Sequence, residues 1–340
     1  MRILAIETSC DETAVAIVKD GNKVEISLVS SQADLHRPFG GVVPEVASRA
    51  HQEWLPLLVR QALDKTGYGP GDFDAVAATR GPGLVGALLV GVSFAKALAL
   101  SWEVPWVGVN HLEGHLASLE LADPAFEPPF VALLVSGGHT EYVAVTEGWE
   151  ISFLGGTLDD AAGEAFDKVA HLLGLGYPGG PAIENAAADY KGVELFDFPI
   201  PMKAHVGCDI SFSGLKTAVA MALDGVGGGG NGATASYWAA SFQSCAVRGL
   251  VAKLQAAVQS AGGNRVALCG GVAANQALRS ETAELTDRRG WELGVCPLEY
   301  CGDNAAMIGA AAFGVLQREG ESSFELDADP RLSLVKIDGN

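Results

Sequence analysis

Two histidines stand four residues apart in the stretch Val109–Ala117 (VNHLEGHLA), and they are the residues of this sequence with the most evident chemistry. Four residues correspond to about 400° of rotation in an α-helix, so His111 and His115 leave the same face and can bind one metal ion. Asn110 is a suitable N-cap, and the apolar run before it predicts a strand. We therefore expect the pair at a strand–helix junction. Two helical histidines that bind nothing remain the alternative for a bare H-x-x-x-H pattern.

The spacing resembles the zinc-protease motif H-E-x-x-H but differs from it in one residue. In that motif a glutamate directly follows the first histidine. Here the glutamate is Glu113, about 200° around the helix from His111, so it points away from the metal-binding face. A metalloprotease is therefore disfavoured, because its general base is missing.

Composition and length indicate a two-domain α/β enzyme. The chain has 340 residues, of which 49% are hydrophobic and 19% charged, with 43 glycines. This length predicts about two domains, and the composition is typical of an enzyme with a large core. Glu7 interrupts the first apolar run, which argues against a signal peptide. The longest apolar stretch, Leu84–Trp102, contains Lys96 and is expected to be a buried helix and not a membrane span.

Cysteine usage and net charge favour a cytoplasmic protein that does not bind nucleic acid through its whole surface. The six cysteines are scattered and form no CxxC pair, as expected for reduced thiols. A net charge of −19 repels phosphate backbones over most of the surface but allows a local basic patch. Candidates for such a patch, with ordinary solvated charges as the alternative, are Arg37, Arg49, Arg60, Arg80 and Lys96.

Two segments of the chain resemble one another. Ile3–Val18 and Phe130–Val145 each consist of an apolar strand, a short turn of Ser, Thr, Gly and acidic or His residues, and a second apolar strand. This pair suggests a duplicated domain in which each half opens with a ligand-facing turn. Small and hydroxylated residues in such turns let backbone N–H groups approach a phosphate closely. Two facing copies would enclose a cleft.

Two glycine-rich segments differ in what they indicate. Gly270–Gly271 lies between the expected strand Arg265–Cys269 and a helix beginning near Ala274, which places helix N-terminal amides where a nucleotide can bind. A tight connection without a ligand is the alternative. Gly225–Gly230 matches G-x-G-x-x-G only through low complexity and follows a helix, so we expect a flexible surface loop there.

Apolar periodicity predicts helices that alternate with strands, the α/β pattern. In the last turn before the final helix, Asp303 of CGDN is a natural N-cap, and that structural role is the alternative to a functional one. The predicted helices are Glu45–Thr66, Val85–Ser101, Ala161–Leu173, Ala235–Ser260, Ala274–Arg289 and Ala305–Arg318. The predicted strands besides the two hairpins are Ala75–Thr79, Trp106–Asn110 and Arg265–Cys269.

Taken together, these motifs resemble the universal tRNA threonylcarbamoyltransferase family (TsaD/Kae-type proteins), which belongs to the sugar kinase/Hsp70/actin fold superfamily. The resemblance covers nearly the whole chain in the family's order, apart from the loop at Gly227–Gly230 and the acidic tail around Glu325–Asp329. It is carried by IETSCDET (6–13), PEVASRAH (44–51), RGPGLVGALLVG (80–91), NHLEGH (110–115), LLVSGGHT (133–140), DDAAGEAFDKVAHLLGLGYPGGP (159–181), ISFSGLKTAV (210–219), GGVAAN (270–275) and CGDNAAMI (301–308).

The resemblance implies an α/β fold of duplicated, actin-like type with two domains and a central cleft. Residues 1–128 would form the first domain, and residues 129–302 the second, which carries helical insertions. A C-terminal helix over residues 303–340 would pack back on the first domain.

The implied activity is transfer of a threonylcarbamoyl group from threonylcarbamoyl-AMP to the exocyclic amine of the tRNA adenosine 3′ of the anticodon, with release of AMP. In this family two histidines and an aspartate bind a metal, which corresponds here to His111, His115 and Asp303. The positions that correspond to substrate-binding residues are Leu134, Val135, Ser136, Gly137, Gly138, Asp167, Gly180 and Asn275. For Asp167 the alternative is an exposed carboxylate paired with Lys168 or Lys216.

The residue chemistry is consistent with this activity. An aromatic exocyclic amine is a poor nucleophile, so the carbonyl that it attacks must become more electrophilic. Two imidazoles and a carboxylate leave positions open on a metal, which then acts as a Lewis acid worth several kcal/mol of barrier. This ligand set fits Fe(II) or Zn(II), and the sequence alone does not choose between them; one divalent metal per chain is expected, with Fe(II) first and Zn(II) second. Asp11, Glu12 and His139 are the candidates for proton removal or phosphate orientation.

The resemblance also implies partners and leaves alternatives open. Expected partners are tRNA, the enzyme that makes the labile adenylate, an inactive paralogue and an ATPase, with no membrane. An ATPase or small-molecule kinase of the same superfamily is the first alternative, although such enzymes use Mg²⁺ with oxygen ligands. A non-catalytic scaffold is the second, although it should have lost the metal ligands.

Overall fold

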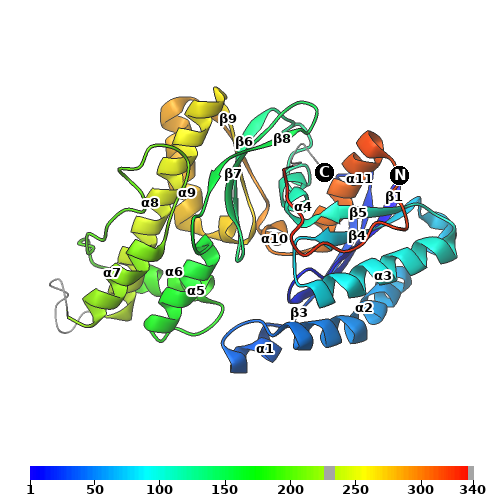
Figure 1. Ribbon diagram of the computed structural model, residues 1–340, viewed down its shortest axis with the longest axis horizontal. Coiled ribbons are helices and arrows are strands. Elements are labelled where there is room, and N and C mark those ends of the chain that lie inside the picture. The colour runs from blue at the N-terminus through cyan, green and yellow to red at the C-terminus, as the bar shows by residue number, and fades with distance from the viewer. Residues whose placement is uncertain (226–233, 336–340) are drawn as a thin grey trace. The chain divides into compact units, whose positions relative to one another are not determined.

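The computed structural model describes residues 1–225 and 234–335, and the chain divides into two units (Figure 1). Unit 1 comprises Met1–Phe126 together with Cys296–Asn340, and unit 2 comprises Glu127–Val295. Unit 2 is therefore inserted between two segments of unit 1.

The second boundary lies earlier in the chain than the sequence indicated. Residues 296–302, expected in the second domain, group with unit 1. They include the short helix α10 (Leu298–Cys301), and the sulfur of Cys296 accepts a hydrogen bond from Ser118 Oγ at 3.0 Å. This contact attaches the returning chain to the end of the segment that bears the two histidines.

The sheet of unit 1 has the strand order β3-β2-β1-β4-β5. β1 pairs antiparallel with β2 and parallel with β4, and β4 pairs parallel with β5. The β1–β2 hairpin and the strands β4 and β5 therefore confirm the sequence-based elements. The strands are β1 (Arg2–Glu7), β2 (Glu12–Lys19), β3 (Lys23–Ser31), β4 (Ala75–Gly81) and β5 (Trp106–Asn110).

Helices cover both faces of this sheet. Leu4 and Ile6 of β1 point into the core formed with α2 and α3, whereas the neighbouring Ala5 lies against Gly309 of α11 on the opposite face. A Cβ atom at Gly309 would stand 2.5 Å from Val18 Cγ2, so glycine lets α11 approach β2 closely. The helices of unit 1 are α1 (Ala33–His36), α2 (Pro44–Thr66), α3 (Val85–Trp102), α4 (His111–Ala117), α10 and α11 (Ala305–Glu319), with 3-10 turns at Arg37–Phe39 and Pro70–Asp72.

Unit 2 repeats the same topology. Its strand order is β10-β9-β6-β7-β8, with β6 antiparallel to β7 and parallel to β9, so β6, β7, β8, β9 and β10 take the places of β1, β2, β3, β4 and β5. The predicted duplication is confirmed. The strands are β6 (Phe130–Val135), β7 (Thr140–Val145), β8 (Ile151–Gly156), β9 (Arg265–Cys269) and β10 (Glu292–Val295), and the helices are α5 (Ala162–Leu172), α6 (Gly179–Asp189), α7 (Ser213–Leu223), α8 (Ala235–Ala261) and α9 (Gln276–Arg289), with a 3-10 turn at Gly271–Ala274.

The six predicted helices are all present, but two expectations about helix ends were wrong. α9 begins at Gln276 and not at Ala274, because Asn275 caps it by accepting the N–H of Leu278 at 3.0 Å. The helix expected over residues 303–340 is shorter than predicted. α11 ends at Glu319, and Gly320 follows with a positive φ of 82°. Of the glycine loop at 225–230, residues 226–230 lie outside the described residues.

Beyond α11 an extended segment, which we call the C-terminal strap (Ser322–Ser333), lies along β5 and its neighbours. The strap begins by pairing its Ser322 N–H with the carbonyl of Trp106 at 3.0 Å. Its Asp329 N–H donates to the carbonyl of Arg80 at 2.7 Å, and its Ser333 carbonyl accepts from Asn110 Nδ2 at 3.0 Å. The strap therefore holds the end of β5, where the histidine helix begins.

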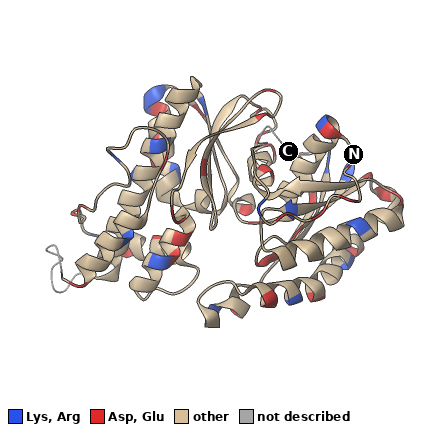
Figure 2. Ribbon diagram, viewed as in Figure 1, with Lys and Arg blue, Asp and Glu red and all other residues tan. Residues whose placement is uncertain are grey.

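Two of the five basic side chains considered for a nucleic-acid patch donate hydrogen bonds to the C-terminal strap. Lys96 Nζ donates to the carbonyl of Phe324 at 2.9 Å, and Arg80 Nη1 donates to that of Asp327. Arg37 pairs with Asp34. Figure 2 shows basic residues interspersed with acidic ones along α2.

The apolar helix α3 is long and hydrophobic enough to cross a membrane when judged by length and composition alone. In unit 1, however, its Val92, Ala95 and Ala99 are buried against β1 and β4 as part of the core. Helices of this kind are common in the cores of α/β domains.

Candidate metal centre and substrate turn

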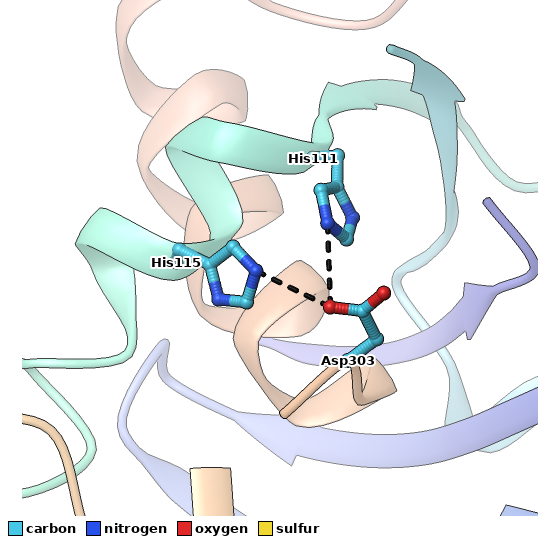
Figure 3. Close-up of side chains that lie close together, drawn as sticks. All are labelled: His111, His115 and Asp303. Carbon is cyan, nitrogen blue, oxygen red and sulfur yellow. Dashed lines mark ion pairs between the residues drawn. The ribbon is translucent and has the colours of Figure 1, made fainter. Parts of the chain in front are cut away.

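Three side chains that the sequence singled out converge in unit 1. His111 and His115 project from α4, and Asp303 from the turn between α10 and α11 (Figure 3). The Nε2 atom of His111 lies 3.4 Å from Asp303 Oδ1, and that of His115 lies 3.3 Å from the same oxygen. Ligands about 2.1 Å from a tetrahedral metal stand about 3.4 Å apart. The spacing of these atoms therefore suits a shared metal ion.

The local sequence explains why α4 presents both rings to the same point. Asn110 ends β5, and its Oδ1 accepts the N–H of Leu112 at 2.9 Å, so the expected N-cap is present. Between the histidines, Gly114 faces α11, where an added Cβ would stand 2.7 Å from Ile308 Cδ1. The absent side chain lets α4 lie close to the helix that follows Asp303.

Asp303 does not cap α11. That position belongs to Asn304, whose Oδ1 accepts the N–H of Met307 at 3.0 Å. The structural alternative for Asp303 was therefore wrong, and its carboxylate is directed at the two imidazoles (Figure 3). Its side chain is 22% exposed, the most accessible of the three.

His115 is buried, and neither of its ring nitrogens has a hydrogen-bond partner among the described residues. Its Nε2 is near Asp303, yet neither ring nitrogen makes a hydrogen bond of normal geometry to any described residue. A buried polar nitrogen without a hydrogen bond costs about 1–3 kcal/mol. Burial also lowers the pKa of His115, so the ring is neutral near pH 7 and has a lone pair to offer. An unpartnered neutral imidazole is what a metal ligand requires.

His111 has a different environment. Its Nδ1 lies 3.0 Å from Glu7 Oε2 and 3.2 Å from Ser9 Oγ. Burial lowers the pKa of His111, but the carboxylates of Asp303 and Glu7 outweigh it and raise this pKa well above its usual value. The carboxylates of Asp303 and Glu7 thus stabilise a positive charge at or beside the His111 ring. A protonated His111 or a bound cation supplies it.

Glu7 was not identified as a functional residue from the sequence. It is fully buried, and it also accepts hydrogen bonds from Thr79 Oγ1 and the Ser9 N–H. Burial raises the pKa of Glu7, but the facing His111 more than offsets this, and the carboxyl group stays ionised. The available signal was an acidic residue at the end of an otherwise apolar strand, which served only as an argument against a signal peptide.

Glu113 points away from this cluster, as its helical position predicted. Its carboxylate pairs with Arg318 of α11. In a zinc protease the glutamate of the motif lies beside the metal and acts as the general base. Glu113 does not occupy that position.

The turn between β1 and β2 carries two of the three proposed catalytic residues. Burial raises the pKa of Glu12 to about 9, with further contributions from Asp303 and Asp11. Glu12 is therefore protonated near pH 7 when no cation offsets the charge of Asp303. The carbonyl of Asp11 accepts the N–H of Gln32, which fixes the turn against the residue between β3 and α1.

The corresponding turn of unit 2, between β6 and β7, contains the third proposed catalytic residue, His139, and the proposed substrate residues Ser136, Gly137 and Gly138. Ser136 and His139 close it through two hydrogen bonds: the N–H of Ser136 donates to the carbonyl of His139 at 2.8 Å, and the N–H of His139 donates to Ser136 Oγ at 3.1 Å. Gly137 and Gly138 are exposed at its tip, with open space where a Cβ would stand. A ligand can reach the backbone of these two glycines directly.

Close backbone packing supports this turn from below. The side chains of Leu134 and Val135 are fully buried, so only their main chains can meet a ligand. A Cβ at Gly270 would stand 2.4 Å from the Val135 carbonyl, and one at Gly163 2.7 Å from Gly137 Cα. The glycine turn after β9 and the first turn of α5 therefore both touch the substrate turn.

The remaining proposed substrate residues lie in the middle of α5 (Asp167), at the start of α6 (Gly180) and at the N-cap of α9 (Asn275). Asp167 of α5 accepts the N–H of Gly179 at 2.6 Å, and Lys168 and Lys216 both pair with Asp160. Gly180, one residue on, has open space around it.

Asn275 is more deeply engaged in the fold than the sequence indicated. It is 6% exposed; besides capping α9, it donates from Nδ2 to Gln243 Oε1 at 2.8 Å. Its first role is thus to fix the start of α9 beside the glycine turn. Only the remaining hydrogen-bonding capacity of its amide is open to a ligand.

Comparisons with known proteins agree on one family. The sequence model of the tRNA N6-adenosine threonylcarbamoyltransferases matches residues 23–310. The protein of that name from Thermotoga neapolitana is 48% identical over 335 residues, which cover 98% of this chain and all of the relative. The one from Clostridioides difficile is 45% identical over 97% of this chain and 98% of its own. The one from Desulforapulum autotrophicum is 51% identical over 91% of this chain and 92% of its own.

Solved structures with a similar fold are much more distant in sequence. HypF of T. kodakarensis has a TM-score of 0.63 at 16% identity, with 95% of this chain and 49% of that chain covered. Component A of the (R)-2-hydroxyglutaryl-CoA dehydratase of Acidaminococcus fermentans has a TM-score of 0.56 at 14% identity. The match covers 92% of this chain and 96% of that chain. These similarities support the actin-like α/β fold and carry no statement about activity.

Proposed function

Because this chain belongs to the tRNA N6-adenosine threonylcarbamoyltransferase family, it is a transferase acting on tRNA, and we propose that His111, His115 and Asp303 hold the metal ion on which the transfer depends. The single observation that carries the metal proposal is the buried ring of His115, which has no hydrogen bond of its own and faces the same carboxylate as His111.

The donor set fits a first-row transition metal. Two imidazoles and a carboxylate are typical ligands of Fe(II) and Zn(II), of which we favour Fe(II). The cation would also neutralise the two carboxylates that surround His111. When bound, it supplies Lewis-acid polarisation to the group being transferred.

We further propose threonylcarbamoyl-AMP as donor and the adenosine 3′ of the anticodon as acceptor. In this reaction a bond forms between the adenosine N6 and the carbamoyl carbon, the bond from that carbon to the phosphate oxygen breaks, and AMP leaves. The exposed Gly137–Gly138 backbone suits the adenylate, with Asp167, Gly180 and Asn275 at its nucleoside end. A protonated Glu12 is suited to donate a hydrogen bond, which leaves Asp11 and His139 as candidates for taking the N6 proton.

The comparisons do not favour the alternative activities. The family match supports neither a protease nor a kinase, and Glu113 is bound to Arg318, away from the place of a protease base. An ATPase or kinase would have to use a site with two imidazoles, which Mg²⁺ rarely prefers.

A reconstitution assay tests the activity and the metal site together. An extract from cells depleted of this protein, supplied with unmodified tRNA, ATP, threonine and bicarbonate, receives wild-type protein, His111→Ala or His205→Ala. His205 is an exposed histidine in unit 2 and serves as the matched control. We expect threonylcarbamoyladenosine, measured by nucleoside mass spectrometry, with wild type and His205→Ala but not with His111→Ala. No product from wild type, in an extract that its native enzyme restores, contradicts the activity.

We propose that the protein acts in the cytoplasm with an inactive paralogue and an ATPase of the same pathway. The net charge of −19 supports shared delivery of the tRNA, because the chain repels phosphate over much of its surface. The purified chain alone is expected to bind tRNA weakly at physiological salt. Tight binding under those conditions, measured by filter retention, would contradict this part of the proposal.

A further inference from the structure

Glu7 is a fully buried carboxylate at the end of β1 that none of the steps above uses. We propose that Glu7, fixed by Thr79, is a positioning residue of the metal centre that orients the His111 ring and sets which of its nitrogens faces the metal. The inference rests on the proposed function, because it takes His111 as a metal ligand.

The carboxylate is held from three sides. Its Oε1 accepts the N–H of Ser9 at 2.5 Å, and its Oε2 accepts from Thr79 Oγ1 at 2.5 Å. The same Oε2 lies 3.0 Å from Nδ1 of His111. Thr79 is 1% exposed and comes from β4, the strand next to β1. Two neighbouring strands therefore fix the position of this one side chain.

This arrangement determines the tautomer of His111. An ionised carboxylate only accepts hydrogen bonds, so the hydrogen of the contact must sit on Nδ1. The lone pair of the neutral ring is then on Nε2, the atom that lies 3.4 Å from Asp303 Oδ1. Carboxylates that accept the outer N–H of a metal-binding histidine both orient the ring and raise its donor strength.

The two histidines of the centre are consequently unequal. His111 is held by Glu7 and Ser9, whereas His115 has no hydrogen bond to a described residue. The described polar contact of His115 is the one between its Nε2 and Asp303 Oδ1, at 3.3 Å. Only His111 is held from behind by a carboxylate, that of Glu7, a residue 104 positions away in the chain.

Metal affinity is the quantity that tests this role. Purified full-length protein is freed of metal and titrated with Zn(II) against a chelator, and separately with Co(II), whose absorption spectrum reports ligand geometry. The variants are Glu7→Gln and Thr79→Val. Glutamine has one acceptor oxygen for three donors, so its amide NH₂ must face one of them. We expect Glu7→Gln to bind Zn(II) about 10–100-fold more weakly and to shift the Co(II) spectrum. Thr79→Val should weaken binding by a smaller factor.

Thr13→Val is the matched control. Thr13 is as buried as Thr79 and its Oγ1 also contacts a buried histidine, with His51 Nδ1 at 2.8 Å, but it touches none of the three metal ligands. It should keep the wild-type affinity within about twofold. A role of Glu7 that is merely structural would lower the thermal midpoint while the folded fraction kept its Zn(II) affinity and Co(II) spectrum.

The outcomes separate this inference from the proposed function. If wild type binds metal and His111→Ala does not, but folded Glu7→Gln binds like wild type, the role of Glu7 is refuted and the metal centre stands. If Glu7→Gln does not fold, Thr79→Val decides, and an unchanged affinity and spectrum there refute the role. If wild type binds no better than His111→Ala, the metal proposal itself fails and this inference with it.

Discussion

At the scale of single residues, the proposed centre combines an excess of negative charge with a neutral ring that makes no hydrogen bond to any described residue. Asp303 and Glu7 both face His111, and His115 lies beside them. Each of these features is unfavourable by itself, and a bound cation relieves both. Metal binding and folding stability must therefore be linked.

We predict that a divalent metal stabilises the wild-type protein and not Asp303→Asn. A ligand at about 100 times its Kd adds about 2.7 kcal/mol to the free energy of unfolding when it binds only the folded state. The thermal midpoint, measured with Zn(II) and then with excess chelator, should differ by several degrees in wild type. Asp303→Asn should show little difference. Equal shifts in both proteins would mean that the metal acts elsewhere.

The residue scale also shows where sequence reasoning succeeds. The i, i+4 spacing of the histidines is local and was visible in the chain. The contact between Glu7 and His111 joins the end of β1 to the start of α4 and leaves no local pattern. For Asp303 the local pattern was misleading, because its neighbour Asn304 takes the capping position.

At the scale of elements, the turn of unit 2 depends on glycines that lie outside it. A Cβ on residue 163 would stand 2.7 Å from Gly137 Cα and 2.8 Å from the Ser136 carbonyl. Both atoms belong to the backbone, so they yield only if the turn moves. The first turn of α5 thus sets the shape of the proposed substrate turn.

We predict that Gly163→Ala impairs transfer while the metal affinity stays unchanged. Overpacking of this kind typically costs about 1–3 kcal/mol, and here part of the cost displaces Gly137. The readout is the rate of tRNA modification against donor concentration, together with Zn(II) affinity. Gly263→Ala, at a position where a Cβ meets nothing within 4 Å, is the control and should behave like wild type. An unchanged rate in Gly163→Ala would argue against a role for the turn.

Helix α2 contains a further buried histidine whose protonation affects unit 1. His51 is fully buried, its Nε2 lies 3.0 Å from the Cys10 carbonyl, and its Nδ1 contacts Thr13. Burial lowers the pKa of His51 below its usual 6.5, so the ring is neutral in the folded protein at pH 7. The unfolded state takes up the proton first as the pH falls. Stability from this group is therefore present above pH 6.5 and is lost on acidification.

We predict that the stability advantage of wild type over His51→Gln shrinks between pH 7.5 and pH 5. The variant has no titrating ring at this position, so only wild type loses the contribution. Thermal midpoints of the two proteins, measured side by side across this range, give the difference directly. An advantage that is constant with pH would show that the ring does not titrate differently in the two states.

The elements themselves were predicted to different degrees for physical reasons. The buried strands β1, β4 and β9 are continuous apolar runs, and the long helices have clear periodicity, so the sequence identified them. β3 and β8 are edge strands of mixed polarity, and β10 has only four residues. Strands of this kind are defined by pairing with a neighbour, which local sequence does not encode.

At the scale of the whole molecule, the C-terminal strap connects the end of the described chain to the start of the histidine helix. Its Ser333 carbonyl accepts from Asn110, whose Oδ1 in turn caps α4. The strap also packs closely on Gly81, where a Cβ would meet the Asp329 carbonyl. Residues far from the metal ligands in sequence therefore help to hold them.

We predict that deleting the chain from Ser322 onward weakens Zn(II) binding severalfold and lowers the thermal midpoint. The deletion removes the partners of Trp106, Lys96 and Asn110 together. A shorter truncation after Val335 removes none of the described contacts and should leave both quantities unchanged. Wild-type metal affinity in the longer deletion would show that the strap does not support α4.

The order of synthesis gives the inserted arrangement of the two units a further consequence. A ribosome produces His111 and His115 with the first segment of unit 1, then all of unit 2, and only afterwards Asp303. At about 5–20 residues per second, this delay is roughly 10–40 s. During that time the nascent chain has two metal-binding rings but not the carboxylate that completes the set. For the metal site proposed above, the ligand set is therefore complete only after the inserted unit and Asp303 have been synthesised.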